Sequence, residues 1–101
     1  MPIKVALQTI DGKKLREVVP TKALLNRLLP MGESRFPILR YVDPYSNTIF
    51  NGAQMYPLIE ELDQLIKDAA SEEDKSILAA VRELAVDCRD RPQTYLRFID
   101  D

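Results

Sequence analysis

The sequence contains no histidine and no tryptophan, only one cysteine, and only three glycines. Without histidine, it lacks the commonest general base and the commonest metal ligand in proteins. Histidine-dependent catalytic triads are therefore excluded, and one cysteine cannot complete a usual zinc site. Three glycines are too few for a glycine-rich phosphate loop. We therefore expect a protein that is not an enzyme and that binds neither a cofactor nor a metal.

Long apolar runs are also missing. No run approaches the roughly 20 residues that a membrane span needs, and the start, MPIKVALQTI, shows no charged leader followed by an apolar segment. A single cysteine, Cys88, excludes an internal disulfide framework. We expect a cytoplasmic protein with no membrane association. Its 101 residues, 46% hydrophobic and 30% charged, predict one globular domain over residues 1–101.

The first forty residues predict a hairpin and a short helix. Apolar residues alternate over residues 3–10, which indicates a strand with one buried face. Asp11-Gly12 is a hairpin signal, and residues 13–19 form the predicted return strand. Four leucines within residues 22–29 predict a short helix with Thr21 as its N-cap. Pro30 ends this helix, because the residue before a proline avoids the helical conformation.

The middle of the chain predicts a second hairpin around the stretch YVDPYSNTIFNGAQM, residues 41–55. Residues 36–42, FPILRYV, are expected to form a strand, with Pro37 at its start or on a sheet edge. Asp43-Pro44 fits the start of a type I turn, and Asn47 suits the left-handed position that often follows. Residues 48–50 then make a short return strand, and Asn51 or Gly52 can cap a following turn.

The last half of the chain predicts two helices and a strand. Apolar residues at helical spacing over residues 55–69 indicate an amphipathic helix. Ser71 begins a second helix that runs through Cys88, and the short connection predicts an antiparallel αα-hairpin. Residues 94–100 alternate again and are expected to insert into the sheet. The predicted fold is α+β, in the order ββ-α-ββ-αα-β: an antiparallel sheet of four to five strands packed on one face by helices.

Charge is distributed unevenly along the chain. Residues 1–40 hold eight basic and three acidic residues, a net charge of +5, whereas residues 41–101 hold six basic and thirteen acidic residues, a net charge of −7. Such a split can mean a basic binding face and an acidic one, or two halves that attract each other, within one chain or between two. The favoured interpretation is ordinary solvated surface charge.

Acidic residues and the cysteine are the first candidates for chemistry. Paired carboxylates such as Asp43, Glu60, Glu61 and Asp63 could perform acid–base chemistry if burial separated their pKa values. We expect Asp43 to form a turn with its own backbone, and the other three to lie mostly on the solvated face of a helix. Cys88 lies on the inner stripe of its helix and is expected to act as a small buried hydrophobe.

Tyrosine marks the candidate contact surface. Tyr45 lies at a turn tip, where the turn itself needs no aromatic side chain, and Tyr41, Arg40 and Asn47 lie nearby in sequence. Exposed tyrosine with arginine is typical of protein interfaces. The alternative for Tyr41 is that it packs into the core with Phe50. The leading hypothesis is a small protein-binding module: an inhibitor, immunity-type, adaptor or accessory protein.

Two alternatives stay open. The first is a nucleic-acid-associated regulator that contacts phosphate through Lys13, Lys14 and Arg16 of the first hairpin. The isoelectric point near 5.2 and the lack of any aromatic residue before Phe36 disfavour nucleic acid as a partner, and lysines at a hairpin rim also block edge-to-edge pairing.

The second alternative is a metal-free enzyme using Asp, Arg and Tyr. It would need a pocket joining Asp43 to Arg40 or Arg97, with a raised carboxylate pKa. An exposed sheet edge would also favour self-association into a homo-oligomer.

Overall fold

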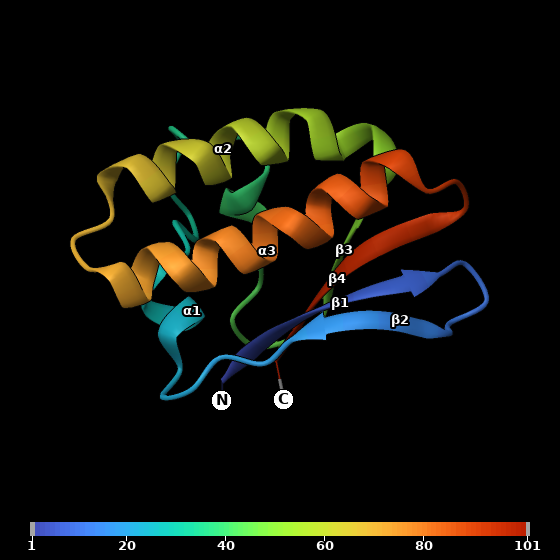
Figure 1. Ribbon diagram of the computed structural model, residues 1–101, viewed down its shortest axis with the longest axis horizontal. Coiled ribbons are helices and arrows are strands. Elements are labelled where there is room, and N and C mark those ends of the chain that lie inside the picture. Colours follow the sequence, from blue (N-terminus) through green and yellow to red (C-terminus); the bar gives the residue numbers. More distant parts are fainter. Residues whose placement is uncertain (1, 101) are drawn as a thin grey trace.

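A computed structural model describes residues 2–100, in which an antiparallel sheet and three helices give the predicted α+β fold (Figure 1). The strands are β1 (Ile3–Thr9), β2 (Lys14–Val18), β3 (Thr48–Asn51) and β4 (Thr94–Asp100). The helices are α1 (Leu24–Leu28), α2 (Met55–Asp68) and α3 (Glu72–Asp90), with two 3₁₀ turns, η1 (Leu39–Tyr41) and η2 (Gly52–Gln54).

The four strands form one antiparallel sheet in the order β2-β1-β4-β3. β1 and β2 make the predicted hairpin, and the predicted insertion of the last strand is confirmed, because β4 pairs with β1 on one side and with β3 on the other. The register shifts after Leu7, so Leu15 and Arg16 both turn toward the helices, where Leu15 packs on the core and Arg16 meets α3.

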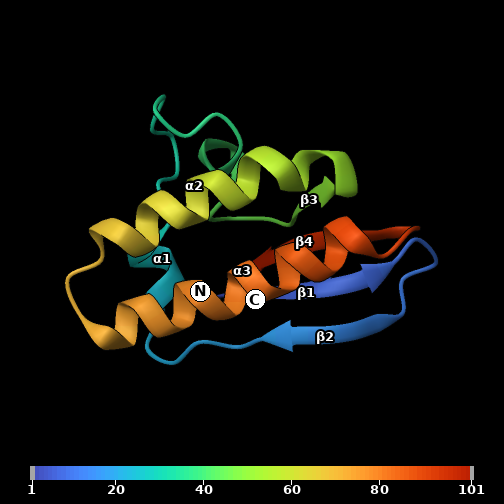
Figure 2. The ribbon, with the colours of Figure 1, turned by 45° about the horizontal axis from the view of Figure 1, so that its top comes forward.

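All three helices lie on one side of the sheet (Figures 1 and 2). α2 and α3 form the predicted αα-hairpin, and each buries its apolar stripe in the core. Ser71 caps α3 as predicted, since its hydroxyl oxygen accepts a hydrogen bond from the Asp74 amide at 3.1 Å. Asn51 caps η2 in a full capping box with Gln54, which confirms the predicted capping role.

The core lies between the sheet and the helix layer. Val5 of β1 is paired with Phe98 of β4, and Leu7 with Leu96, and these four side chains are buried. The Phe50 ring of β3 meets the Phe98 ring edge-on, with centroids 5.7 Å apart. Cys88 is 1% exposed among these apolar residues, which confirms its expected role as a buried hydrophobe.

The predicted strand over residues 36–42 is wrong. This segment folds as irregular backbone that ends in the 3₁₀ turn η1, and β3 therefore pairs with β4 instead of with residues 36–42. Pro37 has no amide to donate to a sheet. The next two amides, of Ile38 and Leu39, donate to the Glu61 carboxylate on α2 and are unavailable for strand pairing. The sheet consequently has four strands.

The predicted start of the first helix is also wrong. α1 begins at Leu24, after Lys22 and Ala23 adopt left-handed backbone angles near φ +54° and +53°. Thr21 does not cap the helix with its side chain. The predicted leucine stripe is confirmed, because Leu24 and Leu25 are buried in the core side of the domain.

Candidate functional site

The segment between η1 and β3 is a tightly held turn. The Asp43 carboxylate accepts hydrogen bonds from the Tyr45 amide and from the Ser46 hydroxyl, each at 2.8 Å. The Asp43 amide in turn donates to the Thr48 hydroxyl at 2.9 Å. The two hydrogen bonds that the carboxylate accepts lower the pKa of Asp43, and the bond from the Tyr45 amide is the largest cause. The predicted turn role of Asp43 is confirmed.

The predicted contact residues all lie on the outside of this segment. Tyr45 is 87% exposed and Tyr41 is 65% exposed. The Arg40 guanidinium stacks over the Tyr41 ring, 5.2 Å from its centroid. The structure thus rejects the alternative that packs Tyr41 into the core, whereas Phe50 does pack there.

Asn47 is exposed, but its predicted left-handed conformation is wrong. Among residues 2–100, the non-glycine residues with positive φ are Lys22, Ala23 and Gln93. The turn already has its hydrogen bonds from Asp43, so the chain re-enters β3 without a left-handed residue at position 47.

Glu61 supports the same segment from α2. Its side chain is 7% exposed, and its two oxygens accept hydrogen bonds from the Ile38 and Leu39 amides at 2.9–3.2 Å. The prediction that Glu61 lies on a solvated helix face is wrong, because this carboxylate satisfies backbone amides that the irregular segment leaves without sheet partners. Glu60 and Asp63 are exposed as expected.

A shallow groove of about 380 Å³ borders this region. One wall comes from Arg35–Pro37, and the other from α2, including Pro57, Glu60 and Gln64. Glu61 reaches the groove, but its oxygens are already committed to backbone amides. The groove offers apolar surface beside mixed charge and shows no convergent set of reactive groups.

The basic residues of the first hairpin do not form one patch. Lys13 lies at the exposed turn, and Lys14 pairs with Glu17 at 3.0 Å. Arg16 turns to the opposite side of β2 and donates to Asp87 of α3 at 3.3 Å. Arg27 similarly pairs with Asp74. Two basic residues of the first part of the chain therefore pair with acidic residues of the second part, as expected if the two parts attract each other.

Asp43 and Cys88, the two groups considered for chemistry, have shifted pKa values. The pKa of Asp43 is lowered, whereas the enzyme alternative needs a raised carboxylate pKa. The pKa of the Cys88 thiol is raised, chiefly by burial, which disfavours the nucleophilic thiolate. Within residues 2–100, no three side chains of the metal-ligating types gather into a metal site.

A surface that the sequence reasoning missed lies on the sheet face away from the helices. We call this surface the open face, and it consists of Lys4, Ala6 and Gln8 of β1, Lys14 and Glu17 of β2, Ile49 and Asn51 of β3, and Tyr95, Arg97 and Ile99 of β4. The alternation of residues 94–100 showed that Tyr95 and Arg97 share a face. Only the strand order shows that this face also carries Lys4 and Lys14.

Comparisons with protein-family models, with curated proteins and with solved structures found no match to this chain. Within the described part of the chain, no helix is both long and apolar enough to cross a membrane.

Proposed function

We propose that this chain is a small cytosolic protein-binding module that acts by surface recognition, as an inhibitor, immunity-type, adaptor or accessory protein. One observation carries the proposal: Tyr45 is 87% exposed on a turn whose backbone is fixed by Asp43. The ring lies almost entirely outside the core, and it stands near a second exposed tyrosine that stacks with an arginine, a composition that is enriched in protein interfaces.

The neighbouring residues support the same surface. Tyr41 and Arg40 are exposed and already stacked on each other, and tyrosine and arginine are enriched among residues that dominate binding energy. Tyr41 ends η1, and the preceding Leu39 is fully buried and bonded to Glu61. A recognition loop held in this way loses little conformational entropy on binding, which favours affinity.

The experiment compares the two tyrosines of the proposed surface with a control tyrosine whose surroundings resemble those of Tyr41. Tyr56 is 63% exposed and stacks with Arg89, much as Tyr41 is 65% exposed and stacks with Arg40. Tagged wild-type protein is purified from its native cells, and any stoichiometric partner is identified by mass spectrometry. The doubly substituted Tyr41→Ala, Tyr45→Ala protein is expected to lose that partner, and Tyr56→Ala is expected to retain it.

Two results would overturn the proposal. One is a wild-type purification that returns no stoichiometric partner. The other is a partner that the Tyr41→Ala, Tyr45→Ala protein retains at the wild-type dissociation constant. Circular dichroism of each variant shows whether the domain stays folded, so loss of binding can be separated from loss of structure.

A further inference from the structure

The open face places one aromatic side chain, that of Tyr95, among amides and cations. This observation is independent of the turn that carries Tyr45. Gln8 is paired with both Lys14 and Tyr95, and Tyr95 is paired with Asn51, so these four residues form one row across the sheet. Neighbouring strands are about 4.8 Å apart, so the row spans about 15 Å. Tyr95 is half-buried and lies between the amides of Gln8 and Asn51.

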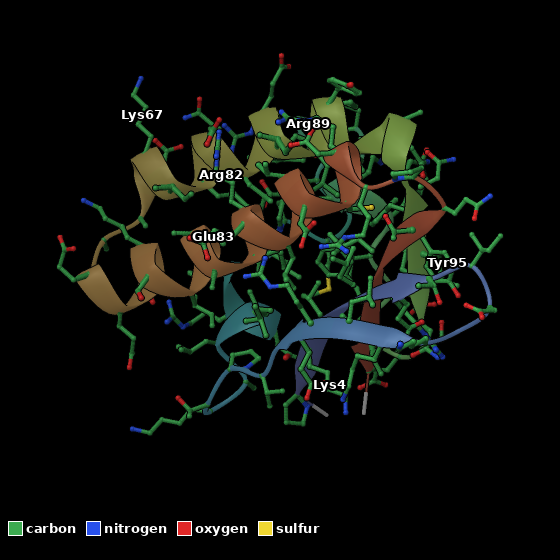
Figure 3. All side chains as sticks on the ribbon, turned by 45° about the vertical axis from the view of Figure 1, so that its right-hand side comes forward. Lys4, Lys67, Arg82, Glu83, Arg89 and Tyr95 are labelled. Carbon is green, nitrogen blue, oxygen red and sulfur yellow. The ribbon has the colours of Figure 1, made fainter. Side chains whose placement is uncertain are left out.

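Cations border this row. Arg97 lies two residues along β4 from Tyr95, on the same side of the sheet, and Lys4 lies farther along β1. Figure 3 shows Tyr95 and Lys4 on the sheet, apart from Lys67, Arg82 and Arg89 on the helices. With Lys14, which pairs with Glu17 at 3.0 Å, the described residues of the open face include three cations against one acid.

The helices on the other side of the sheet have the opposite charge. α2 and α3 together hold ten acidic and four basic residues, a net charge of −6. A polyanion approaching this molecule is therefore repelled from the helix layer and attracted to the open face. The overall net charge of −2 hides this polarity.

Two polar atoms on the open face lack a hydrogen-bond partner among the described residues. They are Oε1 of Gln8, whose residue is 7% exposed, and Nε of Arg97. A buried polar group without a partner is costly, and the cost falls if a ligand supplies the missing donor or acceptor. Gln8 lies next to Tyr95 in the row, so the acceptor is beside the aromatic ring.

We infer that the open face binds single-stranded nucleic acid. Tyr95 stacks on an unpaired base, and Gln8 bonds to the edge of a base that Tyr95 holds. Arg97, Lys4 and Lys14 contact backbone phosphates. The open face of an antiparallel sheet suits splayed bases, since each base offers a ring face for stacking. An acidic peptide would satisfy the cations but would make no use of the ring between two amides.

This surface differs from the first-hairpin site that the sequence predicts for nucleic acid. Lys14 belongs to both, but Arg16 is on the helix side and is replaced by Arg97. The missing aromatic comes from β4, because the strand order places the end of the chain beside its beginning.

The test measures fluorescence anisotropy of labelled single-stranded DNA and RNA oligonucleotides with the full chain, at about 50 mM and about 200 mM salt. We expect binding at the lower salt that weakens at the higher salt. Tyr95→Ala is expected to weaken binding about tenfold, since it removes the base–aromatic stack, and Tyr95→Phe should preserve it. The DNA and RNA arms show which nucleic acid is preferred.

Matched controls come from the helix layer. Tyr56→Ala removes an exposed tyrosine and Lys67→Glu reverses an exposed cation on α2, and both should leave binding unchanged. Arg97→Glu should abolish binding and provides a second variant if Tyr95→Ala fails to fold. Absence of binding at low salt overturns the inference. Binding that Tyr95→Ala leaves intact, or that polyglutamate displaces as well as unlabelled oligonucleotide does, also overturns it.

Discussion

The Arg27 guanidinium binds the Asp74 carboxylate through two contacts, at 2.8 Å and 3.3 Å. This pair ties α1 to the first turn of α3, across 47 positions of sequence. The Asp74 residue is 5% exposed, whereas the Arg27 side chain is 58% exposed. The carboxylate thus depends on the arginine for its main partner, and this dependence can be measured.

A double-mutant cycle tests this pair. Arg27→Met leaves a buried carboxylate without its cation, and Asp74→Asn removes the charge, so each should lower the free energy of unfolding. The double variant should lose less than the two single losses combined, because the second change removes an interaction that is already broken. Additive losses in urea denaturation would show that the pair is not coupled.

The same pair gives a pH dependence. The hydrogen bond from Arg27 lowers the pKa of Asp74 below its usual value of 3.8. A lowered carboxyl pKa stabilises the fold above the unfolded-state pKa, and that stability is lost as pH falls through the folded-state pKa. Acid titrations followed by circular dichroism should show a smaller loss in Asp74→Asn than in wild type. An identical loss below pH 3.8 in both proteins would contradict the assignment.

Glu61 should be the most sensitive acidic residue on α2. Glu61→Ala leaves the Ile38 and Leu39 amides without their acceptor, and we expect a loss of about 2–4 kcal/mol in urea denaturation. The Ile38 and Leu39 amides should also exchange their hydrogens faster. The neighbouring Glu60→Ala is the control, and its exposed side chain should change stability by less than about 0.5 kcal/mol. Equal effects of the two substitutions would refute the role of Glu61.

Protonation of Asp43 should weaken the hydrogen bonds that hold the turn carrying Tyr45. Hydrogen bonds from the Tyr45 amide and the Ser46 hydroxyl lower the pKa of Asp43, so the turn keeps its acceptors above pH 3.8 and loses them at lower pH. In nuclear magnetic resonance, the Tyr45 amide shift should follow this titration, and Asp43→Asn should remove it. A Tyr45 amide that shows no titration between neutral and acidic pH would contradict this contact.

The Cys88 thiol should react only when the domain opens. It is 1% exposed, and burial raises its pKa, so both access and thiolate fraction are low. We expect slow labelling by a maleimide in native buffer and fast labelling in denaturing urea. Fast labelling of the native protein would place this helix face in contact with solvent.

Local patterns predicted most of the elements, because they are encoded by residues close together in sequence. The alternation over residues 94–100 and the apolar period of α2 each depend on one face meeting the core, and both predictions are confirmed. Ser71 and Asn51 acted as caps as expected, since capping also depends on near neighbours.

The errors arose where distant residues decide the conformation. The segment FPILRYV has strand composition, but its amides at Ile38 and Leu39 bond to Glu61 more than twenty positions away. No local pattern shows that pairing. The open face was missed for a similar reason, because Tyr95 and Gln8 become neighbours only through the strand order.

Tyr45 is the residue that we propose touches a protein partner. The most direct measurement places a photo-crosslinking amino acid at position 45, and in a separate protein at position 56, and illuminates each protein in its native cells. We expect one defined heavier species from position 45 and none of the same mass from position 56. No crosslink from position 45, or the same species from both positions, would contradict it.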